Sequence, residues 1–146
     1  MRSSIVLLLV LILMGVAQGE EQKADASAKV TGTITFFGDH PTINKLKLQI
    51  LLYEYDPLLA DVSATLIEKV DFKEFTHVTG KATEKKFEIG AKGKLNEQRG
   101  YYLSVFVLDG DKRVSMGVLD NDKSGIGKVL TNGQPREVKI TAKPIR

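Results

Sequence analysis

The chain has 146 residues, of which 42% are hydrophobic and 27% are charged, and its formal net charge is +3. This length predicts one domain with a core of ordinary size, and the absence of cysteine excludes disulfides, a thiol nucleophile and a thiolate metal site. The charges are interspersed, without the basic stripe and interleaved aromatics of a nucleic-acid-binding protein, so we expect no nucleic-acid partner.

The first nineteen residues have the order of a secretory signal peptide. Arg2 gives a basic start, residues 5–17 are an unbroken apolar run, and the small residues Ala17 and Gly19 mark a cleavage site. The run is shorter than the roughly 20 residues of a spanning helix. We therefore expect residues 1–19 to be removed, leaving a periplasmic or secreted protein without a transmembrane segment. An uncleaved membrane anchor is the alternative.

Residues 20–28 are polar and small and are expected to form a flexible leader before a single domain at 29–146. Alternating apolar and β-branched residues then predict the first strand, in which Gly32 marks a bulge or a close backbone approach. The strands predicted in this way lie at 29–37, 45–55, 85–89, 101–108, 113–119 and 137–142.

Residues 58–75 are ambiguous. Leu59, Val62 and Leu66 have near-helical spacing, whereas the residues from 65 onward also fit a strand. We favour a short turn at 57–63 followed by a strand, with a helix as the alternative.

About seven strands separated by turn residues, with no long helix and no βαβ rhythm, predict an all-β domain. Such spacing is typical of an antiparallel sandwich or a small barrel. We predict a seven-stranded antiparallel β-sandwich of the immunoglobulin or transthyretin kind.

One loop resembles the start of a calcium-binding loop. Asp120, Asp122 and Ser124 have the D-x-D-x-S-G spacing of this motif, so they are the candidate metal ligands. The ninth position is Lys128 and the twelfth is Thr131, where a full loop has a bidentate glutamate. Ordinary loop punctuation is the alternative interpretation. We therefore expect no cofactor, and calcium is the one candidate ion.

The chain shows no motif of a hydrolase. Its two histidines, His40 and His77, have no recognisable nucleophile beside them, and a site that uses both depends on their proximity in space. Glu54 and Asp56 are a carboxylate pair of the kind glycosidases use, although such a pair also keeps a strand end soluble. We expect no enzymatic activity, and hydrolase chemistry at this pair is the least favoured hypothesis.

Several segments, taken in order, resemble a known family. Residues 59–67 match an L-A-D-x-x-A-T-x-I segment after the second strand, and residues 129–133 match a closing V-L-T-x-G. Between them lie a phenylalanine-containing strand at 86–89 and a tyrosine-led strand at 100–105. With the first strand at 30–35, these segments resemble the YbaY-like family of bacterial envelope lipoproteins, which is related to the lipoprotein chaperones of type III secretion.

The resemblance implies a small β-sandwich with an accessory or chaperone-like role and no catalytic residues. Members commonly carry a lipobox cysteine; this chain has none, which implies a protein that is not tethered by lipid. The sequence therefore predicts a non-enzymatic secreted or periplasmic protein that binds another envelope or extracellular protein, by surface complementarity or strand addition. A small-ligand or calcium-binding module that uses the loop at 120–125 is the alternative.

Overall fold

The computed structural model describes residues 27–146. The predicted signal peptide and residues 20–26 of the predicted leader lie outside the described residues. The strands are β1 (Val30–Phe36), β2 (Ile43–Tyr55), β3 (Thr65–His77), β4 (Thr83–Ile89), β5 (Gly100–Asp109), β6 (Lys112–Leu119), β7 (Lys128–Val129) and β8 (Glu137–Pro144). Within residues 27–146, the structure contains no apolar helix that is long enough to cross a bilayer.

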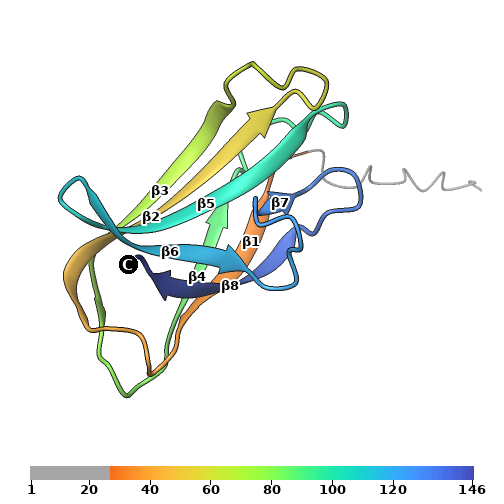
Figure 1. The fold of residues 1–146 in the computed structure, drawn as a ribbon. Helices are drawn as coiled ribbons and strands as arrows, with labels where there is room; N and C mark the ends of the chain where they lie inside the picture. The colour runs from red at the N-terminus through yellow and green to blue at the C-terminus, as the bar shows by residue number, and fades with distance from the viewer. Residues whose placement is uncertain (1–26) are drawn as a thin grey trace, which may run out of the picture.

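The strands form one rolled sheet in the order β3-β2-β5-β6-β8-β1-β4, and the short β7 pairs with β5 (Figure 1). All neighbours are antiparallel except β1 and β8, which are parallel. The all-β class is confirmed, but the architecture is a nearly closed barrel rather than the predicted antiparallel sandwich. The reason is that β8 pairs with both β6 and β1, which joins into one sheet the strands that a sandwich would divide between two.

The barrel closes between its edge strands β3 and β4 through side chains. The Lys85 ammonium lies 4.3 Å from the centre of the Phe72 ring, and the Glu68 carboxylate accepts a hydrogen bond from the Gly90 amide. Register shifts between β2 and β3, with positive φ at Lys45 of 52°, help to bend this wall. The seam therefore carries side-chain bridges where a closed sheet would carry backbone hydrogen bonds.

The inward residues of the strands meet in one core, as the alternating pattern predicts. Fully buried members include Ile34, Ile50, Tyr101 and Ile140. Gly32 is the predicted close approach and not a bulge, because β1 keeps a regular register with β4 and a Cβ at Gly32 would lie 2.7 Å from the Phe87 ring.

The ambiguous segment is resolved as a turn-rich loop followed by strand β3, as favoured. Val70 and Phe72 pack against the core, whereas Leu66 is 46% exposed. A register shift between Leu52 and Tyr53 of β2 intervenes, so Leu66 does not share the inward face with Val70.

Candidate functional site

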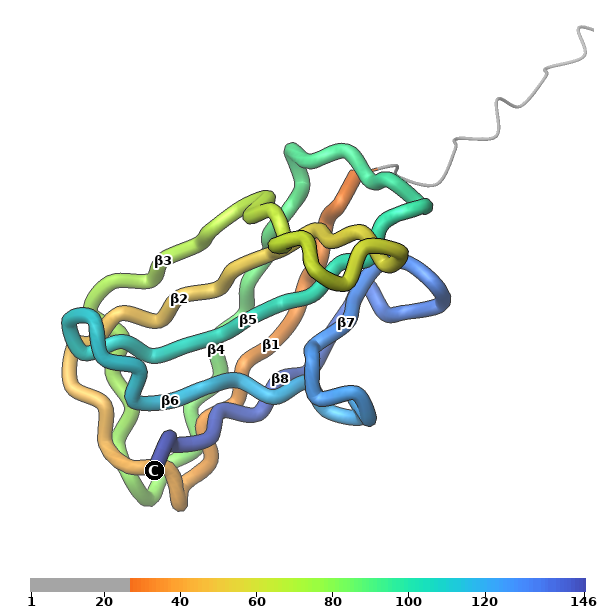
Figure 2. Tube along the Cα trace, turned by 45° about the horizontal axis from the view of Figure 1, so that its top comes forward, coloured from red at the N-terminus to blue at the C-terminus, as the bar shows by residue number. Residues whose placement is uncertain are grey.

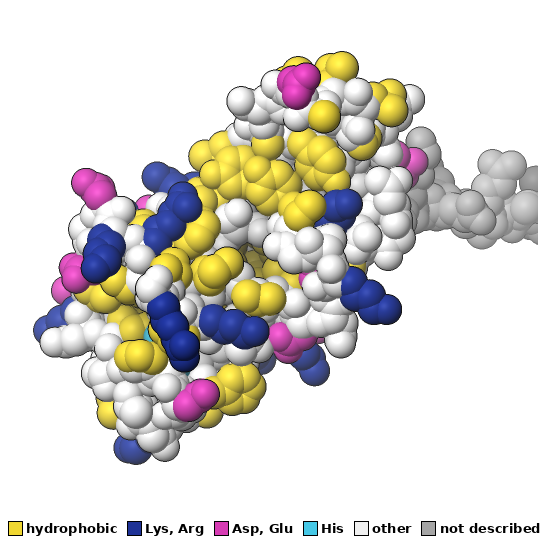
Figure 3. Space-filling model, viewed as in Figure 1, with side chains coloured by type: hydrophobic (Ala, Val, Ile, Leu, Met, Phe, Trp, Pro, Cys, Tyr) yellow, Lys and Arg dark blue, Asp and Glu magenta, His cyan; other side chains and the backbone are white. Residues whose placement is uncertain are grey.

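The outer face of β2, β5 and β6 is unusually apolar for a surface that faces solvent. Its residues lie at the outward positions of the strands and are adjacent through the strand register. We call this surface the aromatic face, and it consists of Leu51, Tyr53, Tyr55, Tyr102, Phe106 and Met116. The tyrosines and Phe106 are half-buried, Met116 is exposed, and Leu51 beneath them is only 7% exposed. Figure 3 shows apolar side chains gathered over these strands.

Ring contacts hold the aromatic face together. Tyr53 stacks on its cross-strand partner Tyr102, with ring centroids 5.0 Å apart and 18° between the planes, and Tyr55 tilts against Tyr102 at 5.9 Å. The Arg113 guanidinium lies 3.9 Å from the centre of the Phe106 ring. Burial, followed by the neighbouring Tyr53, raises the pKa of Tyr102 above its ordinary value of 10.0. The rings are therefore a fixed surface and not a set of independent side chains.

In the loop that is the candidate calcium site, both aspartate carboxylates accept hydrogen bonds from neighbouring groups of the protein. Asp122 Oδ1 accepts hydrogen bonds from the Ser124 amide at 2.9 Å and the Ser124 hydroxyl at 2.6 Å, and Oδ2 accepts one from the Gly127 amide at 2.6 Å. These bonds, that of the Ser124 hydroxyl foremost, lower the pKa of Asp122. Asp120 Oδ1 accepts from the Thr141 hydroxyl at 2.8 Å. Among residues 27–146, no three His, Cys, Asp or Glu side chains gather as a metal site, and calcium binding stays a prediction.

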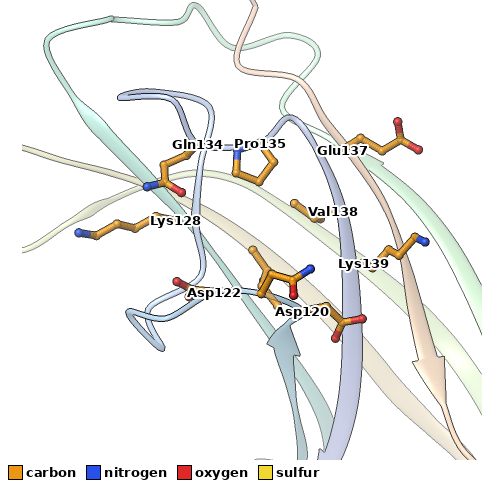
Figure 4. Close-up of a pocket in the computed structure, with 10 residues that line it drawn as sticks. Asp120, Asp122, Lys128, Gln134, Pro135, Glu137, Val138 and Lys139 are labelled. Carbon is orange, nitrogen blue, oxygen red and sulfur yellow. The ribbon is translucent and has the colours of Figure 1, made fainter.

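Asp120 and Asp122 also line an open pocket of about 520 Å³ between the ends of β6 and β8 and the loops beside them. Lys128, Glu137 and Lys139 line the same pocket, but their charged ends point away from one another (Figure 4). A site for a specific small molecule has polar groups that converge on the ligand. These charged ends do not converge in this way.

The two histidines are brought together, which the sequence left open. His40 and His77 are 3% and 1% exposed, and their ring centroids are 5.4 Å apart. His40 Nδ1 donates to the Pro41 carbonyl at 2.8 Å, so in the neutral ring Nε2 accepts from the Ser115 hydroxyl at 2.9 Å. Ser115 is 2% exposed. A backbone carbonyl thus occupies the place that an orienting carboxylate holds in a catalytic triad.

His77 completes this cluster beneath the loops at one end of the barrel. Its Nδ1 lies 2.9 Å from the Thr83 hydroxyl, and its buried Nε2 has no hydrogen-bond partner among the described residues. The Phe36 ring contacts both imidazoles, at 5.2 Å from His40 and 5.7 Å from His77. The cluster is consequently a part of the core.

The carboxylates of the predicted hydrolase pair have separate structural partners. Glu54 Oε2 accepts a hydrogen bond from the Tyr101 hydroxyl at 2.7 Å, and the same hydroxyl accepts one from the backbone amide of Asn96 at 2.9 Å. Burial is the largest cause that raises the pKa of Tyr101. Asp56, beyond the end of β2, forms an ion pair with Arg99 at 2.6 Å. Both carboxylates tie β2 to the start of β5 and the loop before it.

No protein-family model matches the chain, and no curated protein matches it. Among solved structures, the fold is similar to that of an alternative pilotin from the type II secretion system of Vibrio cholerae. The TM-score is 0.55, the sequence identity is 18%, and the match covers 82% of this chain and 98% of that chain. The two proteins therefore share a fold over most of their lengths, while membership of the YbaY-like family stays a prediction.

Proposed function

We propose that this protein is a non-enzymatic accessory protein of the cell envelope, periplasmic or secreted, that binds another envelope or extracellular protein through the aromatic face. The observation that carries this proposal is the fixed cluster of Tyr53, Tyr55 and Tyr102 on the outside of the barrel. Tyrosine, phenylalanine, methionine and arginine are the residue types enriched at protein interfaces. The aromatic face and Arg113 provide all four of them on one wall.

The size and rigidity of this surface suit a protein partner. Stacked rings lose little side-chain freedom on binding, so more of the contact energy is left for affinity. Met116 is 42% exposed and extends the face onto β6, where an unbranched thioether adapts to an irregular partner. The cation of Arg113 at the rim favours a partner with acidic residues beside its apolar anchors.

The chaperone-like part of the proposal has two supports. One is the resemblance to envelope lipoproteins that are related to secretion chaperones, and the other is the fold shared with a type II secretion pilotin. Both support a partner that belongs to a secretion apparatus or is exported with it. We infer that the chain acts by holding such a partner rather than by changing it chemically.

Two features support the absence of catalysis. Ser115 and His40, the closest approach to a nucleophile and its base, are buried, so a substrate has no access to them. Glu54 and Asp56 are each engaged with a structural partner, Tyr101 and Arg99 respectively.

Surface complementarity is favoured over strand addition as the mode of partner binding, because side chains of the seam between β3 and β4 occupy the edge of β3.

A photo-crosslinking experiment tests the proposal. The residue benzoyl-phenylalanine replaces Tyr102 on the aromatic face, and in a matched control it replaces Lys86, which is exposed on the outside of β4. After irradiation in the native host, we expect a discrete adduct of higher mass from the Tyr102 position only. Mass spectrometry of the adduct then identifies the partner.

Two results would overturn the proposal. One is the absence of an adduct at position 102 in every cell fraction, and the other is equal labelling at positions 102 and 86. A second substitution, Tyr53→Ser in the chain labelled at 102, removes the stacked ring. It is expected to weaken the adduct without preventing folding, because Tyr53 lies on the outer face of the sheet.

A further inference from the structure

The loop between β2 and β3 projects three apolar side chains into solvent. Leu58 is 89% exposed, Leu59 is 51% exposed and Val62 is 59% exposed, and together we call them the apolar tip. Figure 3 shows apolar atoms gathered on this projection at the top of the view. Scattered single apolar residues are normal on a surface, but three within five positions of one loop are an exposed patch that needs an explanation.

The exposure of the apolar tip is built into the loop. The Asp56 carboxylate accepts a hydrogen bond from the Leu58 amide at 2.9 Å, and the backbone carbonyl of Asp56 accepts one from the Leu59 amide at 3.2 Å. The Leu59 carbonyl then accepts from the Val62 amide at 3.3 Å. These consecutive turns hold the backbone so that the apolar side chains face outward rather than fold onto the barrel.

The described chain begins at the same end of the barrel. Ser27 pairs with Lys94, and the Ala28 amide donates to the Gly93 carbonyl at 2.8 Å, so the chain enters against the loop between β4 and β5. Arg99 of that loop forms the 2.6 Å ion pair with Asp56 at the base of the apolar tip. The ribbon in Figure 1 and the tube in Figure 2 both place the start of the described chain and the β2–β3 loop at one end of the barrel.

The sequence before this entry point contains the apolar run at residues 5–17. Residues 18–26 separate the run from the barrel, and a segment of this length spans at most about 30 Å when fully extended. In the uncleaved alternative, in which the run lies in a membrane as an anchor, this end of the barrel is held within about 30 Å of the bilayer. The apolar tip is then the part of the described chain best placed to reach the lipid.

The charges at this end do not oppose such an approach. The Asp56 carboxylate is paired with Arg99. The exposed acids Asp61 and Glu97 are balanced by the exposed cations Lys92 and Lys94. The end as a whole is therefore not repelled by anionic headgroups, and its lysines suit the headgroup level.

We propose that, in the form of the chain that retains the apolar run as an anchor, the apolar tip is a membrane-contact loop that inserts Leu58, Leu59 and Val62 into the lipid surface. Lipid is favoured over a protein partner because the tip is a narrow projection at the end of the barrel where the described chain begins. It is a different surface from the aromatic face, which lies along the wall of the barrel. Insertion would leave the aromatic face free, so membrane contact and partner binding are compatible.

The absence of cysteine allows a clean test in the full chain. An environment-sensitive nitrobenzoxadiazole label is attached at Leu58→Cys, and in the control chain at Phe37→Cys. Phe37 is 51% exposed and lies directly after β1, at the far end of the barrel from the chain entry (Figure 1). The protein is bound to vesicles of phosphatidylethanolamine and phosphatidylglycerol in a ratio of about 3:1, an anionic surface of the kind that attracts basic side chains, and is isolated by flotation.

We expect the label at position 58 to shift to the blue and to be quenched by doxyl lipids several-fold more strongly than the label at position 37. Serine at both Leu59 and Val62 is expected to reduce this difference, because the remaining tip is polar. Failure of the full chain to float overturns the proposal. Equal access of aqueous iodide to both labels also overturns it, because a label inserted in lipid is shielded from an aqueous quencher. Neither result depends on whether Tyr102 forms a crosslink, so this proposal and the proposed function fail separately.

Discussion

The substitution Gly32→Ala adds one methyl group where β1, β4 and β8 meet. The new Cβ would lie 2.7 Å from two carbon atoms of the Phe87 ring and 2.8 Å from a methyl group of Val138, closer than carbon atoms pack. Phe87 and Val138 are 6% and 5% exposed, so neither can swing into solvent. Overpacking of this kind costs about 1–3 kcal/mol of folding free energy. For a domain of this size each kcal/mol lowers the melting temperature by about 4 °C.

Urea unfolding of a double-mutant cycle isolates the contact. Phe87→Ala alone is expected to cost about 3–5 kcal/mol, because it leaves a cavity in the core. In the double variant the new methyl group occupies part of that cavity, so Gly32→Ala should cost almost nothing there, with a coupling energy of about 1–3 kcal/mol. The reasoning is refuted if Gly32→Ala stabilises the native protein, as general strand propensity predicts for replacing glycine, or if the two effects are additive.

The remaining predictions concern Tyr101, the alkaline limit of stability and calcium. Tyr101→Phe leaves the Glu54 carboxylate and the Asn96 amide without their shared partner, which should cost about 1–3 kcal/mol in urea unfolding; an unchanged midpoint would contradict this. Because the pKa values of Tyr101 and Tyr102 are raised in the folded state, the unfolded chain loses these protons first, so stability should be complete below pH 10 and fall above it. Melting curves from pH 8 to pH 11 check this, and Tyr101→Phe should flatten the decline. Millimolar calcium should leave the melting temperature within about 1 °C, because Asp122 already accepts three hydrogen bonds within its loop; a clear rise would restore the calcium hypothesis.

Strand β6 places a polar residue on the inner face of the barrel and apolar residues on the outer face. Val114 packs against the core at a register shift between β5 and β6, whereas Met116 and Val118 share the opposite face of the strand. That face is the outer one, since Ser115 and Leu119 are the buried residues of the strand. Ser115 is accepted inside because it hydrogen-bonds to His40. A buried polar pair thus reverses the sense that hydrophobicity alone assigns.

The candidate sites also differ in whether the local sequence marked them. The aromatic face had a local signal, because Leu51, Tyr53 and Tyr55 are apolar at the outward positions of β2, where a strand that faces solvent has polar residues. The apolar tip and the pairing of His40 with His77 had none. His40 lies in the loop after β1 and His77 is the last residue of β3, and they meet only because β1 and β4 are neighbours while β3 leads into β4.

Local sequence by itself determined six of the strand segments and the inward residues of β1, β2 and β8, and it marked Gly32 as a bulge or a close approach, whereas it left the β3 segment open and did not indicate β7. Side chains of a strand alternate with a period of two whatever the strand pairs with, so this information is present in each segment alone. Only the tertiary structure decided that the strands roll into one barrel, because the parallel pairing of β1 with β8 joins backbone groups more than a hundred residues apart. It also decided which carboxylates were already engaged and which apolar side chains remained exposed, because both depend on neighbours from distant parts of the chain.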